Sequence, residues 1–202
     1  TLALRPDFTP SMARSAAKYF MEQNVPIRFC YSGNTFINNI ANRGGAIAVG
    51  DAGTVSGNIK GTFINNTGYY AGGAICIANS ERYPTGNLEG IFINNKAESG
   101  GAIYIEFTYD PNIYLGGTFI NNNASIGGGI YYNVTAPNCQ IINTTFVENT
   151  AVTHGGAIDC NASRMGLYNT TFTNNYAYVG AALCREINAT DGKGKNNTFT
   201  GN

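Results

Sequence analysis

The sequence predicts an all-β fold, a parallel β-helix solenoid of about seven coils with an N-terminal capping helix. Three observations lead to this expectation. A Phe-x-x-Asn motif recurs every 26 to 29 residues, a glycine-rich motif follows all but its last copy by eight or nine residues, and apolar and polar residues alternate around both motifs. A fixed period of this length is the signature of a repeat architecture, in which each unit buries its apolar face against its neighbours.

The Phe-x-x-Asn motif predicts the first strand of each coil and the turn that ends it. Residues such as Ile59, Gly61 and Phe63 share one strand face, which is typical of a strand with one buried side. Coils stacked about 4.8 Å apart place the phenylalanines in one interior column and bring the asparagine amides within hydrogen-bonding distance. Because Asn tolerates the left-handed backbone conformation, we expect the same asparagines to turn the chain. The phenylalanines are Phe36, Phe63, Phe92, Phe119, Phe146, Phe172 and Phe199, and the expected ladder is Asn39, Asn66, Asn95, Asn122, Asn149 and Asn175.

The glycine-rich motif predicts a corner and a second strand. Most copies read Gly-Gly-Ala-Ile, and they occupy residues 44–47, 72–75, 100–103, 127–130, 155–158 and 180–183. Paired glycines permit a sharp corner where the backbone approaches the core closely. The alternation then resumes, as in Ile103 and Ile105, so we expect two strands per coil and a variable segment that carries the loops.

The repeat divides the chain into an N-terminal cap with a short helix, residues 1–30, and the β-helix repeats, residues 31–202. Residues 9–20 combine helix-start signals with an apolar stripe at helical spacing. Because unpaired strand edges favour association, we expect this helix to cover one end of the solenoid, and insertion of the helix into a partner is the alternative. The sequence stops at Asn202 within a repeat, which indicates either a truncated chain or a homo-oligomer whose copies meet head to tail.

Composition and charge argue against several function classes. Lys and Arg total 12 and Asp and Glu total 12, so the formal net charge is zero, and neither nucleic acid nor an anionic membrane is an expected partner. No apolar run reaches the about 18 residues of a membrane-spanning helix. The five cysteines have no Cys-x-x-Cys spacing, and no phosphate-binding motif occurs, so we expect no metal and no cofactor.

Eight Asn-x-Ser/Thr sequons make the chain a candidate glycoprotein. In a chain rich in Asn and Thr such sequons also arise by chance, and the sequence leaves both readings open. The candidate glycosylation sites are Asn65, Asn123, Asn133, Asn143, Asn161, Asn169, Asn188 and Asn196.

The pairing of Phe-x-x-Asn with Gly-Gly-Ala-Ile over residues 34–202 resembles the chlamydial polymorphic outer-membrane proteins and the adhesin-like surface proteins of methanogenic archaea. The resemblance implies a right-handed β-helix, an extracellular or cell-surface location, and a role in adhesion or assembly. Glycans or a host or cell surface are the partners that it implies. The motif pair is specific for the type of repeat and not for one biochemical activity.

Two rows of mainly β-branched residues flank the Phe column on the expected outer face of the solenoid. The candidate interface residues in these rows are Thr62, Ile64, Ile93, Thr118, Ile120 and Val147. They predict an interface with another protein, because exposed apolar strips mark interaction sites. Plain β-propensity explains the same residues, and an ice-binding face with regular Thr and Ile is a further hypothesis.

A carbohydrate-active enzyme is the third hypothesis, because such enzymes also use β-helices and need clustered carboxylates. The expected outward row after the glycine motif contains Asp159 as its only carboxylate, and Glu106 and Asp110 are expected in a loop. We expect His154 to be a corner residue without an acidic partner. The sequence therefore predicts a structural or adhesive module and not an enzyme.

Overall fold

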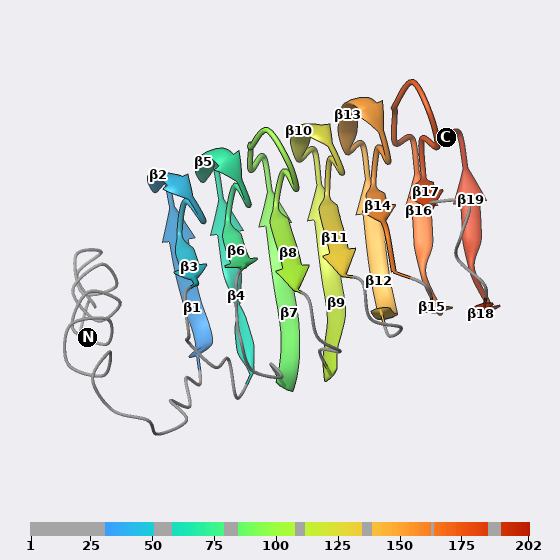
Figure 1. The fold of residues 1–202 in the computed structure, drawn as a ribbon, viewed down its shortest axis with the longest axis horizontal. Helices are drawn as coiled ribbons and strands as arrows, with labels where there is room; N and C mark the ends of the chain where they lie inside the picture. The colour runs from blue at the N-terminus through green and yellow to red at the C-terminus, as the bar shows by residue number, and fades with distance from the viewer. Residues whose placement is uncertain are drawn as a thin grey trace.

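The computed structural model describes residues 31–50, 58–78, 85–107, 112–134, 139–162, 164–185 and 191–202. All regular elements within these ranges are β-strands, which stack into coils along one axis (Figure 1). The predicted all-β parallel solenoid is confirmed. The predicted cap and its helix, residues 1–30, lie outside the described residues.

The first sheet contains the Phe strands and forms one side of the coils. Its strands are β1 (Tyr31–Ile37), β4 (Ile59–Ile64), β7 (Thr85–Ile93), β9 (Asn112–Ile120), β12 (Cys139–Val147), β15 (Arg164–Tyr168), β16 (Thr171–Thr173), β18 (Asp191–Lys195) and β19 (Thr198–Thr200). All pairs are parallel, and equivalent residues of successive coils lie opposite each other, as with Phe63, Phe92 and Phe119. The repeat in the sequence thus keeps the phenylalanines of successive coils in register.

The second sheet begins at each glycine corner. It contains β3 (Ile47–Val49), β6 (Ile75–Ala78), β8 (Ile103–Phe107), β11 (Ile130–Val134), β14 (Ile158–Cys160) and β17 (Leu183–Arg185). These strands pair in parallel in the order of the coils. Ile75, Ile103 and Ile130 point inward from this sheet and are fully buried.

A third side closes each coil, although the sequence predicted only two strands per coil. It contains β2 (Ile40–Arg43), β5 (Thr67–Ala71), β10 (Asn123–Ile126) and β13 (Thr150–His154), which lie along the top of Figure 1. Isolated bridges at Lys96 and Ser99 connect β5 to β10. Each of these segments is short and turns only small residues inward, such as Ala124 or Ala151. The sequence therefore shows no alternation of large apolar and polar residues along them.

The interior holds the predicted column of phenylalanines. Neighbouring rings from Phe36 to Phe199 stack with centroids 4.6 to 5.1 Å apart and interplanar angles of at most 16°. Phe119, in mid-column, is fully buried between Phe92 and Phe146. Each ring thus covers the next, and a single coil could not bury its own.

The predicted asparagine side chains lie beside the phenylalanine column and link three successive coils. The backbone N–H and the side-chain amide of Asn95 both donate to Oδ1 of Asn122, each at 3.0 Å. Nδ2 of Asn95 also donates to the carbonyl oxygen of Phe63 in the preceding coil, at 3.0 Å. The same contacts recur at the equivalent asparagines along the stack. Asn66, Asn95, Asn122 and Asn149 are fully buried, so these bonds satisfy amides that water cannot reach.

The ladder asparagines do not turn the chain, and the expectation that they do was wrong. The left-handed conformation belongs to the residue before each of them, for example Asn121 at φ 51° before Asn122 and Glu148 at φ 54° before Asn149. This preceding residue is exposed, whereas the ladder side chain must point inward to reach its partners. The turn and the ladder are therefore separate tasks of neighbouring residues.

Candidate functional site

The outer face of the first sheet brings the candidate interface residues together. Thr62, Ile91, Thr118 and Thr145 lie opposite one another in successive coils and form one column. Ile64, Ile93, Ile120 and Val147 form a second column on the other side of the phenylalanines. The six predicted residues are all half-buried, and Ile91, which belongs to the first column, is exposed.

The register of this sheet changes between β9 and β12. In β4, β7 and β9, a glycine (Gly61, Gly90 or Gly117) lies two residues before the Phe on the inner face. From β12 onward an additional residue enters, and Asn143 at φ 51° bulges outward while Thr144 points inward. The hydroxyl of Thr144 donates to the carbonyl oxygen of Ile142 at 3.0 Å, which satisfies this buried group.

A hollow of about 620 Å³ lies on the outer face beside this change of register. Gly116 belongs to its lining and contributes no side chain. Glu89 is opposite Gly116 in the preceding coil, and a Cβ atom at Gly116 would lie 3.1 Å from the carbonyl oxygen of Ile142 in the following coil. Tyr114 and Thr118, two residues to either side, point to the same outer face. The remaining lining residues are Lys60, Asn87, Gly90, Ile91, Leu115, Gly117 and Asn143.

The hollow combines an aromatic surface with polar groups of both charges. Tyr114 is 42% exposed. Nζ of Lys60 lies 3.4 Å from Oε2 of Glu89, and both side chains are largely open to solvent. The lining therefore carries one paired cation and anion, together with the amides of Asn87 and Asn143 and the hydroxyl of Thr118. The sequence did not predict this site, because the site depends on the register of adjacent coils. Its signal in the sequence is the change from Gly-Thr-Phe at residues 117–119 to Asn-Thr-Thr-Phe at residues 143–146.

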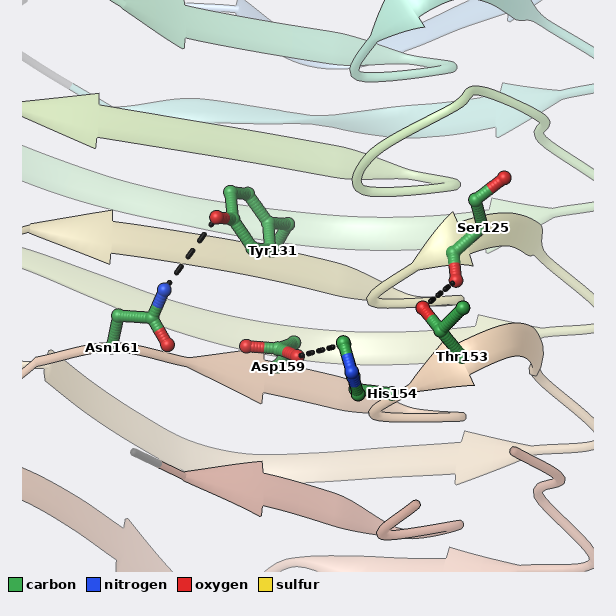
Figure 2. A network of polar contacts seen from close by, with 6 residues as sticks. All are labelled: Ser125, Tyr131, Thr153, His154, Asp159 and Asn161. Atoms are coloured by element: carbon green, nitrogen blue, oxygen red, sulfur yellow. Dashed lines mark hydrogen bonds and ion pairs between the residues drawn. The ribbon is translucent and has the colours of Figure 1, made fainter. Parts of the chain in front are cut away.

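A second polar group lies at the corner between the third side and the second sheet (Figure 2). Nδ1 of His154 lies 3.8 Å from Oδ2 of Asp159; the Asp159 side chain is almost fully buried, whereas that of His154 is 46% exposed. The expectation that His154 has no acidic partner was therefore wrong. The glycine corner folds the chain back between these residues, so that a separation of five residues in sequence becomes a contact.

Other contacts in Figure 2 join adjacent coils around this pair. Nδ2 of Asn161 donates to the hydroxyl oxygen of Tyr131 at 3.5 Å, and the hydroxyl of Thr153 donates to the carbonyl oxygen of Ser125 at 2.8 Å. The ring of Tyr131 also stacks on that of Tyr104, with centroids 5.3 Å apart. These contacts tie three coils together on the outside of the solenoid.

Cys76 and Tyr104 form a covered patch on the outer side of the second sheet. Cys76 packs with Ala71, Ala78 and Tyr104, and burial raises the pKa of its thiol to about 11. Burial also raises the pKa of the Tyr104 hydroxyl, and a hydrogen bond with Glu106 adds to this shift. The sequence suggested that Glu106 and Asp110 lie in a loop. Glu106 belongs instead to strand β8, and Asp110 lies outside the described residues.

The sequons differ in their surroundings. Asn65, Asn123, Asn143, Asn169 and Asn196 are exposed, Asn133 and Asn161 are half-buried, and Asn188 lies outside the described residues. Asn143, Asn169 and Asn196 occupy one outer column, where Nδ2 of each later residue donates to Oδ1 of the preceding one at 3.1 Å. Nδ2 of Asn133 lies 3.4 Å from Oε1 of Glu106.

Within the described ranges, no three His, Cys, Asp or Glu side chains come together as a metal-binding group. In the same ranges, no helix has the length and apolar character needed to cross a bilayer.

Comparison with known proteins supports the type of repeat. Residues 89–106 and 143–161 match the Chlamydia polymorphic membrane protein repeat. Each match contains one Phe-x-x-Asn motif and the glycine corner that follows it, and thus one buried ladder asparagine, Asn95 or Asn149. The matches do not bear on the resemblance to adhesin-like archaeal proteins.

Residues 1–52 match a second family, described as histidyl-tRNA synthetase. Residues 31–50, the described part of this match, form β1, β2 and β3 of the solenoid. No curated protein and no solved structure matches the chain. The chain is thus a β-solenoid with repeats similar to those of the chlamydial polymorphic membrane proteins.

Proposed function

We propose that the protein is a surface-displayed adhesive module that contacts its partner through the outer face of the first sheet. The β-solenoid and the polymorphic-membrane-protein repeats fit a surface or adhesive β-helix module. The observation that carries the choice of face is the pair of columns in register, which contain Ile91, Ile93 and Ile120. A strip of apolar side chains on a regular sheet is typical of an interaction surface.

The proposal places the chain outside the cell or on its surface and assigns it no catalytic activity. The exposed sequons are compatible with glycosylation in that location. Head-to-tail association of several copies is a separate proposal, and sedimentation of the purified chain over a concentration series tests it.

Adhesion is tested with beads coated with the chain and applied to cultured animal cells and to bacterial cells. We expect the coated beads to bind, and the variants Ile93→Lys and Ile120→Lys to reduce binding severalfold, because each places a charge within the apolar column. Val152→Lys is the matched control, since Val152 is exposed on the third side. Equal binding by all three variants, or no binding by the parent, contradicts the proposal.

Ice binding is a second candidate, supported by the same two columns of Thr and Ile on one face. A recrystallisation-inhibition assay at micromolar protein decides it. Activity that disappears in Thr118→Tyr favours this function, and no activity in the parent chain removes it.

A further inference from the structure

We propose that the hollow around Gly116 is a binding subsite for a neutral oligosaccharide. The inference rests on the proposed function and names the chemical class of its partner. The hollow of about 620 Å³ is within the about 300–1,000 Å³ that small-molecule sites occupy. It therefore has room for a short saccharide segment.

The position of Gly116 creates the space. Glu89 lies opposite Gly116 in the preceding coil, and the backbone of Ile142 lies beside it in the following coil; of these three residues only Gly116 lacks a side chain. A Cβ atom at this position would point to the outer face, 3.7 Å from Cγ of Glu89. Backbone thus forms part of the floor of the hollow, and side chains of four successive coils, from β4, β7, β9 and β12, form its walls.

The lining matches the two kinds of surface that a neutral sugar ring presents. The exposed ring of Tyr114 offers an apolar face with a hydroxyl at its edge, against which the C–H face of a pyranose can lie. Glu89, Asn87 and Asn143 supply carboxylate and amide groups that accept or donate hydrogen bonds to sugar hydroxyls. A few convergent polar groups around an apolar wall are typical of a small-molecule site.

Charge favours a neutral ligand over an anionic one. Lys60 is the only cation of the lining, and Glu89 lies 3.4 Å from it. A sulfated or phosphorylated ligand would need several unpaired cations or a bidentate arginine. The zero formal net charge of the chain adds no attraction for polyanions.

The experiment is calorimetric titration of the purified chain with three neutral tetrasaccharides (chitotetraose, cellotetraose and maltotetraose) and with heparin. We expect at least one neutral tetrasaccharide to bind. Gly116→Val fills the hollow without removing a contact, and Tyr114→Ala removes its aromatic wall. Each should weaken that binding at least about tenfold. Tyr178→Ala is the matched control, because Tyr178 is 87% exposed on the third side, and it should leave the affinity within about twofold.

Three outcomes overturn the inference: binding of heparin alone, no binding of any tetrasaccharide, or equal affinities in the Tyr114→Ala and Tyr178→Ala variants. Circular dichroism of each variant verifies the fold, and Tyr114→Ala keeps the test valid if Gly116→Val does not fold. Loss of bead adhesion in Ile93→Lys with no glycan binding would retain the adhesive face and reject this subsite. Glycan binding without bead adhesion would retain this subsite and reject the adhesive face.

Discussion

Oδ1 of Asn149 accepts two hydrogen bonds from Asn122, one from its backbone N–H at 3.1 Å and one from its side-chain amide at 2.9 Å. Oδ1 of Asn122 likewise accepts two hydrogen bonds from Asn95, and Nδ2 of Asn122 also donates to the carbonyl oxygen of Phe92. One buried side chain therefore satisfies groups in three coils. Its removal leaves buried donors and a buried carbonyl without partners.

Asn122→Ala should lower the free energy of unfolding by at least about 3 kcal/mol, since several buried polar groups lose their partners together. Urea denaturation measures the change. Asn121→Gly is the control, because glycine keeps the left-handed turn and the exposed side chain is not part of the buried ladder. It should change stability by less than about 0.5 kcal/mol. Similar losses in the two variants would show that the ladder adds little.

Phe119→Ala should cost about 3–5 kcal/mol, because it opens a cavity in the middle of the ring stack. Tyr114→Ala, on the opposite face of the same strand, should cost less than about 1 kcal/mol. The comparison requires only denaturation curves of the two variants. A cost below about 1 kcal/mol at Phe119 would mean that the rings do not carry the core.

Gly101→Ala and Gly116→Ala are the same substitution in adjacent coils, but their effects on the free energy of unfolding should differ sharply. A methyl group at Gly101 would collide with the carbonyl oxygen of Gly128, whereas at Gly116 it needs only a shift of a few tenths of an ångström by Ile142. We expect a loss of at least about 2 kcal/mol for the first and less than about 1 kcal/mol for the second. Thermal unfolding measured by circular dichroism ranks the two variants, and the reverse order would contradict the corner geometry.

The stability of the protein should decrease as the pH rises from about 9 to about 11. The pKa of Cys76 is raised from 9.0 in its unperturbed state to about 11 in the fold, so the folded state retains a proton that the unfolded state loses. The contribution of the Cys76 thiol to the free energy of unfolding is complete below pH 9 and disappears as the pH rises through about 11. Cys76→Ala should flatten this part of the profile, since alanine fits beside Ala71 and Ala78. An equally steep decline in the variant would assign the effect to other groups.

The sequence predicted the phenylalanine column, the asparagine ladder and the strands of the first and second sheets, and it missed the third side and the residue that turns the chain. The phenylalanine column and the inward asparagines follow from spacing alone. The turning residue was misassigned because Asn fills both positions in most coils, as at Asn121 and Asn122. Glu148 before Asn149 and Gly201 before Asn202 are the copies in which the two positions hold different residue types.

The candidate site could be recognised only from the register of adjacent coils in three dimensions. Gly116 marks a hollow only because Glu89 and Ile142 lie beside it in adjacent coils, and their sequence separations change where Asn143 is inserted. The contact between His154 and Asp159 likewise depends on the angle of the glycine corner. Neither relationship has a periodic signal.

The asparagine ladder gives the solenoid an intrinsic direction. At every step the donors belong to the earlier coil and the accepting Oδ1 belongs to the later one, from Asn39 and Asn66 to Asn175 and Asn202. A cut between any two coils would therefore produce two unlike surfaces. The earlier coil would expose the backbone N–H and Nδ2 of its ladder asparagine and a phenylalanine carbonyl oxygen, and the later coil would expose Oδ1 and Nδ2 of its own asparagine. Such surfaces complement each other only in a translational arrangement. A two-fold axis would pair each surface with a copy of itself and would not reproduce these bonds.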